Sequence, residues 1–482
     1  MIDSILIDSR ALPGSFRVKS VTKGPVMPRV YRFLLLGTSA AALVLTASSA
    51  SHASGYAIRE QSASGQGSSF AGMTAGEGGL SAMFFNPAAL GFVRKPTIEQ
   101  HVSLVVPDAE LVSSSAATVL GTPIGGRTSQ SDVFPDVGVP ALYAAYPIDD
   151  AWTIGLAVNA PYGLGSKYDE DWVGRYHAVK SKLFSINATP TIAWRPTSWL
   201  TLGGGFSTQY IHAELTNAVD FGTIGAIIQD RSGQALPITP QPGAQDGKAK
   251  VEGDDIGFGV VLGAIAEPVE GTRVGLSYRS QISQDIKGDA DFDLGTSGMG
   301  AIVSAATGQF VDTGASASLT TPTTVSLGLS QAIGADLTLL ADLQWTDWSQ
   351  FDELRIDFDN PAQAASVTAQ AWEDTWFASV GAAYRLSDAW TLRAGAAYDQ
   401  SPVPDADRTP RIPDGDRYWL SAGVSWSPIE DWTFDLGYSH IFVEDSTVDL
   451  SASGAGNATR GDLQASYESR IDIIAVAARV SF

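Results

Sequence analysis

The chain closes on Ile474-Ala-Val-Ala-Ala-Arg-Val-Ser-Phe482, a stretch in which apolar residues recur at every second position. Counted back from Phe482, these residues lie on one face, whereas Arg479 and Ser481 lie on the other. A period of two indicates a β-strand, and an apolar face opposite a small or charged face suits a wall between lipid and a polar lumen. A half-buried edge strand of a soluble sheet alternates in the same way, so the rest of the chain has to discriminate between the two.

A short turn followed by an alternating strand recurs along the chain. In Trp432–Tyr438, for example, every second residue is apolar, while Asp435 and Gly437 face the other way. The short turns begin at Ile148, Pro196, Val269, Gly334, Ser387 and Ile429. The connections between these hairpins are long and rich in Gly, Ser, Asp and Pro, near residues 107–135, 216–255, 295–319, 359–374, 401–416 and 451–464.

Short turns at one end and long loops at the other are typical of an outer-membrane barrel. Six turns join twelve strands, and a strand near Thr97–Val106 together with the final strand brings the total to fourteen. We therefore predict an all-β fold, a 14-stranded antiparallel transmembrane β-barrel. An aromatic girdle at the periplasmic interface would include Trp152, Trp199, Trp390 and Trp432. A soluble β-sandwich or propeller is the alternative, but such a fold needs neither long loops confined to one end of its strands nor a secretion signal.

The start of the chain carries such a signal. Arg29 and Arg32 precede an apolar run from Phe33 to Thr46, and Ser51-His-Ala53 supplies small residues for cleavage. We assign residues 1–53 to an upstream extension and a signal peptide, with the signal itself at 27–53. A membrane anchor is the alternative, but the apolar run is shorter than the ~20 residues of a spanning helix.

The composition excludes several classes of function. The net charge of −22 argues against a nucleic-acid partner, which needs a basic surface. Without cysteine there is no disulfide framework and no thiolate metal site. The few histidines are scattered and no Gly-x-Ser-x-Gly elbow precedes a helix, so we expect no enzyme activity and no cofactor.

The segment before the first strand is the candidate to fill the barrel, because fourteen strands enclose more space than their own side chains occupy. Residues 54–95 are rich in Gly and Ser and turn apolar at Met83-Phe-Phe-Asn-Pro-Ala-Ala-Leu90, without strand alternation. We predict that they form an N-terminal hatch that plugs the lumen, with the barrel itself at 96–482. A flexible periplasmic tail is the alternative.

Beyond the signal, the chain resembles from end to end the long-chain fatty-acid transporter family (FadL, OmpP1, TodX), which includes aromatic-hydrocarbon transporters. Each motif alone is weak, but their order along the chain is specific. They are Ser54-Gly-Tyr, Asn86-Pro-Ala88, Asn159-Ala-Pro-Tyr-Gly-Leu164, Asp171-Trp-Val-Gly-Arg-Tyr-His177, Tyr278-Arg-Ser280, Trp345-Thr-Asp-Trp-Ser-Gln-Phe351, Ser401-Pro-Val-Pro404 and Arg411-Ile-Pro-Asp-Gly-Asp-Arg-Tyr-Trp-Leu-Ser421.

The resemblance implies uptake of hydrophobic ligands from outside and sideways release beside a kinked third strand. The predicted kink comprises Ala160, Pro161, Tyr162 and Gly163. Proline cannot donate to the ladder and glycine weakens it, which favours a bend there, although an ordinary strand end also fits.

The predicted gate lies in the hatch at Asn86, Pro87 and Ala88. Proline fixes its own φ and keeps the preceding asparagine extended, while the asparagine amide can bond nearby backbone. A plain structural turn would account for these residues equally well.

Two long loops carry apolar residues at helical spacing, and exposed loops rarely hold such patches without a partner. These residues are Ile224, Ile227 and Ile228 in one loop and Met299, Ile302, Val303 and Phe310 in the other. The resemblance makes them an outer ligand-binding groove, and simple packing against each other as a lid is the alternative.

The carboxylate end of a ligand is where the resemblance weakens. Where the best-known family member has basic residues, beyond its fifth strand and after its ninth, this chain has Asn217 and Thr368. The remaining candidate cations are Arg175, Arg279, Arg408, Arg411 and Arg417, which could instead brace networks with the abundant Asp and Glu.

The predicted function is therefore an outer-membrane channel for uptake of long-chain fatty acids or similar hydrophobic compounds, with hatch-gated lateral release into the membrane. The alternatives are an aromatic-hydrocarbon channel of the same family, a general diffusion porin, and a structural or phage-receptor barrel. The expected partners are the hydrophobic ligand, outer-membrane lipid and lipopolysaccharide, and the barrel-assembly machinery through Phe482. We expect a monomer.

Overall fold

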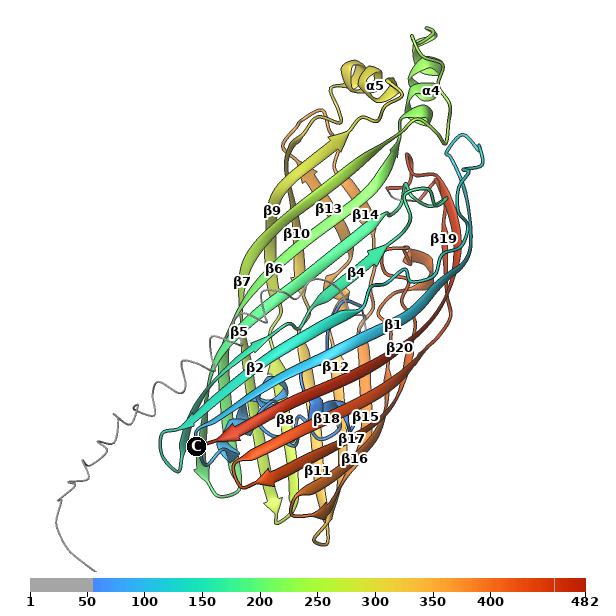
Figure 1. Cartoon of the computed structure of the whole chain (residues 1–482). Helices are drawn as coiled ribbons and strands as arrows, with labels where there is room; N and C mark the ends of the chain where they lie inside the picture. Colours follow the sequence, from blue (N-terminus) through green and yellow to red (C-terminus); the bar gives the residue numbers. More distant parts are fainter. Residues whose placement is uncertain (1–54, 455) are drawn as a thin grey trace, which may run out of the picture. The chain divides into compact units, whose positions relative to one another are not determined.

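A computed structural model of the protein describes residues 55–454 and 456–482, so the predicted signal peptide and upstream extension lie outside the described residues. The described strands form one closed antiparallel wall (Figure 1). The wall closes where β1 (Thr97–Ala117) pairs with β20 (Asp462–Ser481), starting at the pair Thr97↔Ser481. The first strand of the wall is therefore joined to the strand that ends the chain.

The wall consists of fourteen strands, as predicted, and some of them are interrupted. The continuous ones are β1, β2 (Val137–Pro147), β5 (Lys180–Thr197), β6 (Leu200–Asp220), β7 (Asp246–Val269), β16 (Trp390–Asp399), β17 (Arg417–Ile429) and β20. The interrupted ones are β3 and β4 (Trp152–Asn159, Gly163–Lys167), β8 and β9 (Thr272–Arg279, Ile282–Asp293), β11 and β10 (Thr324–Ile333, Thr313–Thr321), β12 and β13 (Leu337–Thr346, Glu353–Phe358), β15 and β14 (Thr375–Ser387, Ser366–Ala369), and β18 and β19 (Trp432–Val443, Ser446–Leu450).

The two ends of the barrel differ, and we call them the turn end and the loop end. All six predicted short turns are present at the turn end, as the tight pairings Val269↔Thr272 and Ile429↔Trp432 illustrate. The predicted girdle tryptophans are 36–52% exposed there, and Trp152 stacks on Trp194 with ring centroids 5.6 Å apart. None of the helices among the described residues is both long and apolar enough to cross a membrane.

The loop end carries two helices, α4 (Phe221–Ser232) and α5 (Met299–Thr307), which lie far from the C-terminus (Figure 1). The predicted boundaries of the long loops were wrong here, because several strands extend further. β1 runs through Pro107, which pairs with Ile471, and β7 already begins at Asp246. Beyond the lipid a strand needs no apolar face, so the alternation that marks a strand in the sequence fades before the strand ends.

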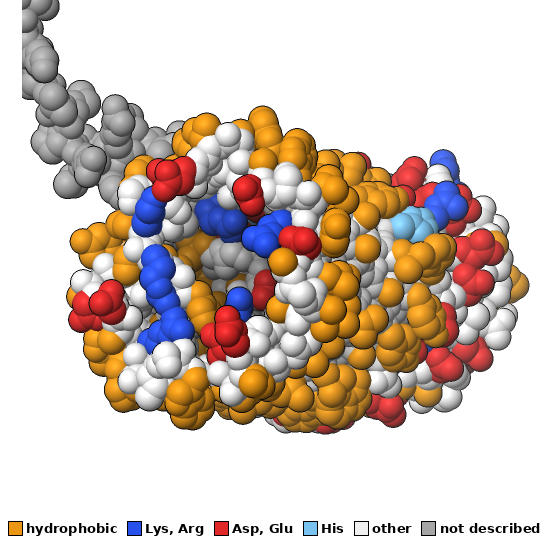
Figure 2. Space-filling model, turned by 90° about the horizontal axis from the view of Figure 1, so that it is seen from below, with side chains coloured by type: hydrophobic (Ala, Val, Ile, Leu, Met, Phe, Trp, Pro, Cys, Tyr) orange, Lys and Arg blue, Asp and Glu red, His pale blue; other side chains and the backbone are white. Residues whose placement is uncertain are grey.

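The wall sorts its side chains by face. On β18, Leu436 and Tyr438 are 47% and 43% exposed on the outside, whereas Asp435 and Ser439 are buried inside. Figure 2, which views the barrel from the turn end, shows hydrophobic side chains over the outer surface and Lys and Arg side chains around a hollow. The outer face therefore matches lipid, and the inner face is polar.

Residues 55–95, which we call the hatch segment, lie inside the wall and are largely buried (Figure 1, blue). They contain three short helices, α2 (Ala63–Gln66), α3 (Ala82–Phe85) and the 3₁₀ helix η1 (Pro87–Phe92). Inward-facing wall side chains bind them: Gln66 donates to Ser439 Oγ at 2.5 Å, Leu80 N donates to Glu99 Oε2 at 3.0 Å, and Ser330 donates to Glu77 Oε1 at 2.7 Å.

The closest approach between hatch segment and wall is made at glycines. Four cross-strand pairs face inward where the hatch passes, and we call them the glycine belt: Gly203↔Gly263, Gly275↔Gly328, Gly381↔Gly395 and Gly423↔Gly437. A Cβ at Gly275 would overlap the Thr74 carbonyl, and a Cβ at Gly395 would overlap the Ser68 carbonyl. The wall lacks side chains at these positions, and the hatch backbone occupies the space.

Gly275→Ala should loosen the hatch without unfolding the barrel, because the added methyl overlaps hatch backbone and overpacking typically costs 1–3 kcal/mol. We expect faster proteolysis within residues 55–95 and higher ion conductance in planar bilayers. Gly138→Ala on β2 is the matched control, since no atom lies within 4 Å of its added Cβ. Equal conductance of the two variants would contradict this role of the belt.

Candidate ligand passage

The predicted kink residues lie at a break in the third wall strand. β3 pairs with both β2 and β5, whereas the structure pairs β4 with β5 only. On β2, Leu142–Pro147 pair with β3, but Val137–Ala141 pair only with β1. In the described part of the chain the ladder is thus open between β2 and β4, and we call this place the ladder break.

The start of the hatch segment pairs with the kink. Ile58 N donates to Pro161 O at 2.7 Å, and Gly163 N donates to Tyr56 O at 2.9 Å. These two bonds enclose the antiparallel bridge Ala57↔Tyr162. Residues 56–58 therefore bond on the inside to the segment where the third strand leaves the ladder.

Two further contacts hold this start in place. Gly55 N donates to Asp414 Oδ2 at 3.0 Å, and the same oxygen accepts the Ser401 hydroxyl at 2.9 Å. Gln61 Nε2 donates to Ala160 O at 2.9 Å, and Gln61 Oε1 accepts from Asn159 Nδ2 at 3.1 Å. Motifs far apart in the sequence thus meet at the N-terminal seven residues of the hatch segment.

Tyr56 lies in a cluster of aromatic side chains that we call the aromatic septum. Its ring centroid is 4.8 Å from Trp348, 5.5 Å from Trp372, 5.9 Å from Phe351 and 5.9 Å from Tyr162. Trp348 and Phe351 belong to the Trp-Thr-Asp-Trp-Ser-Gln-Phe motif between β12 and β13. The septum separates two cavities, because Tyr56 lines one and Trp348 and Tyr162 line the other.

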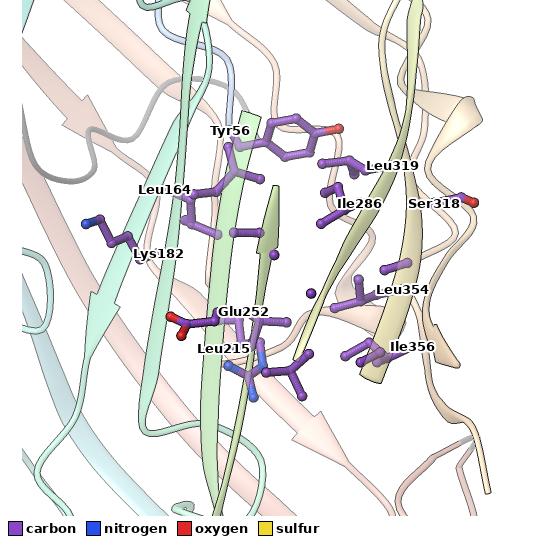
Figure 3. A pocket seen from close by; sticks show the side chains of 18 of the residues that line it. Tyr56, Leu164, Lys182, Leu215, Glu252, Ile286, Ser318, Leu319, Leu354 and Ile356 are labelled. Carbon is purple, nitrogen blue, oxygen red and sulfur yellow. The ribbon is translucent and has the colours of Figure 1, made fainter. Parts of the chain in front are cut away.

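The middle cavity lies on the loop-end side of the septum and has a volume of about 100 Å³. In Figure 3, Leu164, Ile286 and Leu319 converge near Tyr56, and Leu354 and Ile356 continue the apolar wall. The Lys182 amine points away from this centre (Figure 3). The lining suits an apolar chain, because sites of this kind are mostly hydrophobic with a few polar groups.

An outer cavity of about 320 Å³ adjoins the middle one, with which it shares Leu215, Val251 and Arg411. Arg411 bonds the Lys180 carbonyl at 3.1 Å, and Arg460 donates to Thr368 Oγ1 at 2.9 Å. Burial and the nearby Arg460 lower the pKa of Arg411 to about 9, which leaves it charged at neutral pH. An anion between the two guanidiniums would relieve their repulsion.

The predicted loop residues largely pack against one another. Met299 and Val303 are buried together with Phe221, and Ile224, Ile228 and Phe310 pack on them, whereas Ile227 and Ile302 are not in this cluster. Ile224 and Phe310 also line the outer cavity. Five of the seven predicted residues therefore pack together as a lid beside the outer cavity, and ligand binding by the seven stays a prediction.

The predicted gate residues lie at the glycine belt. Asn86 Nδ2 donates to Thr74 O at 2.7 Å within the hatch segment and to Ala264 O at 3.1 Å in the wall. Its Oδ1 accepts from Ala88 N at 3.0 Å, and Pro87 stands at the start of η1. These contacts make Asn86 a fixed anchor between hatch and wall, and movement there remains a prediction.

The five arginines singled out in the sequence divide into two groups. Arg175, Arg408 and Arg417 form ion pairs with Asp246, Asp405 and Asp414. Arg411 instead lines the middle cavity. Arg279 lines the cavity on the other side of the septum, the one lined by Trp348 and Tyr162, which we call the inner cavity. Asn217 and Thr368, at which the resemblance led us to look for basic residues, both line the outer cavity, where Arg460 contacts Thr368.

Sequence reasoning missed Tyr56, Trp348, Trp372, Arg59 and Arg460 as site residues. The first two lie in motifs on which the family resemblance rests, but the sequence did not indicate that they would form part of a site. Arg59 and Arg460 carry no local signal, because their neighbours in the passage come from distant strands.

Glu60 is a buried carboxyl in the same N-terminal stretch. Neither of its oxygens accepts a hydrogen bond from another described residue, and its burial raises the pKa to about 7. Arg417 and Arg59 attract the charged form but do not offset the loss of hydration. Folding therefore favours protonated Glu60.

Between about pH 4.5 and pH 7 the unfolded chain has released the proton that the folded chain keeps, so Glu60 makes stability fall as pH rises. Glu60→Gln should raise the unfolding temperature by a few degrees at pH 8 and leave it unchanged at pH 4, as measured by circular dichroism. Glu430→Gln, at an exposed side chain, is the control and should change neither value. A difference of equal size at both pH values would contradict the assignment.

Comparison with known proteins places this passage in context. A family model described as outer membrane protein transport protein (OMPP1/FadL/TodX) matches residues 44–482. An outer membrane protein of Neisseria meningitidis serogroup B is 30% identical over 462 residues, which is 92% of this chain and 96% of the relative. The long-chain fatty acid transport protein of Escherichia coli K12 is 28% identical over 420 residues, 85% of this chain and 92% of the relative.

A solved structure agrees with the fold. The crystal structure of a Pseudomonas aeruginosa FadL homologue matches with a TM-score of 0.81 and 25% identity, covering 89% of this chain and all of that chain (100%). The similarity therefore extends over the barrel and includes the hatch segment and the loops.

Proposed function

Since this chain belongs to the outer membrane transport protein family OMPP1/FadL/TodX, we propose that it takes up long-chain fatty acids and releases them sideways into the membrane. The observation that carries this proposal is the series of cavities from the lid at the loop end to the ladder break. The outer and middle cavities adjoin, and the septum leads to an inner cavity lined by the kink residues Pro161 and Tyr162.

The cavities support a staged route. Burying each CH₂ is worth about 0.8 kcal/mol, so full burial of a long acyl chain contributes about 10 kcal/mol. One deep site would release such a chain slowly. Several small apolar sites that end at lipid, where burial is equally favourable, allow downhill movement without an energy source.

The charges of the passage support a fatty acid as the ligand. Arg411 lines both the outer and the middle cavity and Arg460 lines the outer one, and the groups that act on them include no carboxylate among the described residues. A ligand carboxylate could bond both, and hydrogen bonds to charged groups are worth about 1.5–3 kcal/mol. An aromatic hydrocarbon, the alternative ligand in this family, has no charged group to pair with these two guanidiniums and could offer them only a weaker cation–π contact.

Release through the wall rests on the ladder break. The N-terminal residues 56–58 bond to the kink, and the remainder of the hatch is held at the glycine belt. In the proposed mechanism the hatch stays in place, as a plug formed by residues 54–95, while its N-terminal strand parts from the kink. Asn86, Pro87 and Ala88 would then serve as the anchor of this gate rather than as its moving part.

A general diffusion porin remains the rival function. The contacts between hatch and wall argue for a closed lumen. Planar-bilayer recordings distinguish a plugged transporter from a porin, because a porin conducts ions steadily. The outward apolar face suits outer-membrane lipid, and we propose that the loop end contacts lipopolysaccharide. We also propose that the barrel-assembly machinery recognises Phe482 and that the channel is a monomer.

Ala57→Cys combined with Tyr162→Cys tests the gate. These residues form a non-hydrogen-bonded pair, whose Cα atoms typically lie about 4.5 Å apart, a separation that a disulfide spans. The chain has no cysteine of its own. The oxidised variant should import oleate at least tenfold more slowly and recover on reduction, measured with radiolabelled oleate in cells that lack another fatty-acid channel.

Each single-cysteine variant is a control and should import oleate equally well under oxidising and reducing conditions. Uptake that is unaffected by the disulfide would show that the N-terminal strand need not leave the kink.

Arg460→Gln tests the ligand class. We expect binding of oleate to the purified protein to weaken by about tenfold to a hundredfold, the equivalent of one lost charge-assisted hydrogen bond. Binding of oleyl alcohol, which has the same chain and no charge, should not change. Arg355→Gln, at an exposed arginine paired with Asp357 at the loop end, is the control. Equal losses for both ligands would point to a structural role for Arg460.

A further inference from the structure

The inner cavity lies between the aromatic septum and the ladder break and has a volume of about 80 Å³. Hatch residues Ala57–Arg59 and Phe84–Phe85 line it on one side, and β8, β11, β12 and β15 line it on the other. Pro161 and Tyr162 of the kink complete it. The inner cavity thus lies beside the kink, on the other side of the septum from the middle cavity.

Two arginines reach the cavity from opposite sides. Arg59, on the hatch segment, donates to Gln344 Oε1 at 3.1 Å and lies 3.6 Å over the Phe377 ring. Arg279, at the end of β8, donates to Phe84 O at 2.7 Å and lies 4.5 Å over the Phe84 ring. A guanidinium has five N–H donors, so each keeps several donors for another acceptor.

The carboxylates nearby do not neutralise both arginines. Asp399 lines the cavity but also lies 3.9 Å from Arg417. Asp399, Asp342 and Glu60 attract Arg59 from beyond ion-pair distance, whereas the groups that act on Arg279 among the described residues are two tyrosines, Tyr143 and Tyr162. A buried guanidinium without a carboxylate is costly, and such groups are commonly found where an anion binds.

The surroundings also suit the first part of an apolar chain. Phe84, Phe85 and Tyr162 line the same cavity as the two guanidiniums. A volume of about 80 Å³ holds on the order of five water-sized groups, enough for a head group and too little for a long chain. The chain would extend across the septum into the middle cavity or past Pro161 toward the ladder break.

We propose that Arg59 and Arg279 form a transit site for the carboxylate of a long-chain fatty acid, between the septum and the kink. This site rests on the proposed uptake function and adds to it a second place where the head group is held. A carboxylate there would bridge the hatch segment to β8, next to the residues that open the ladder. The site favours acids over uncharged chains at the last step before release.

The test compares uptake of two probes, oleate and oleyl alcohol, in cells that lack another fatty-acid channel. The variant Arg59→Gln/Arg279→Gln should import oleate at least tenfold more slowly than the wild type while importing oleyl alcohol at the wild-type rate. Arg59→Lys/Arg279→Lys keeps both charges and should recover most of the oleate uptake. Arg385→Gln, at an exposed arginine of the turn end paired with Asp336, should change neither rate.

Each other outcome overturns the proposal. Equal losses for both probes would show that the arginines only brace Phe84 and Gln344, and unchanged oleate uptake would show that no head group is held there. Outer-membrane abundance and heat-modifiability of each variant verify folding. A wild-type protein that imports neither probe contradicts the proposed function itself, and the transit site with it.

Discussion

The series of outer, middle and inner cavities, which is the candidate passage, depends on the contact between the hatch backbone and the glycine belt. Paired glycines such as Gly275 and Gly328 let the hatch lie directly against wall backbone, and Asn86 bonds carbonyls on both sides of that contact. A body held in this way over several strands does not leave as a whole without breaking many contacts at once. For this reason the proposed gating motion involves only the N-terminal stretch that meets the kink.

The distribution of charge follows from the same arrangement. The chain is strongly acidic, with a net charge of −22, yet the cavities are lined by Arg411 and Arg279, on which no carboxylate acts in the described part of the chain. Arg417, by contrast, is bound to Asp414, the residue that also accepts the first described backbone amide. Arginines in ion pairs hold the hatch and loops together, whereas Arg411 and Arg279 line the cavities of the proposed ligand route.

Much of the fold was predictable because lipid acts on each strand separately. The fourteen strands and six short turns follow from the alternation that each strand carries alone. Loop boundaries were wrong where strands such as β1 continue beyond the lipid, since no apolar face is required there. Pro161 indicated the kink in the sequence. Helical spacing indicated the predicted loop residues, although these residues pack mainly on one another.

By itself, then, the sequence determined the barrel and the orientation of its faces, because these depend on local patterns of polarity. Only the tertiary structure decided which distant residues meet. Tyr56 joins Trp348 and Trp372, and Arg59 joins Arg279, because the closure and stagger of the wall bring together positions hundreds of residues apart. Such contacts leave no periodic trace along the chain, since each depends on the position of every strand between its partners.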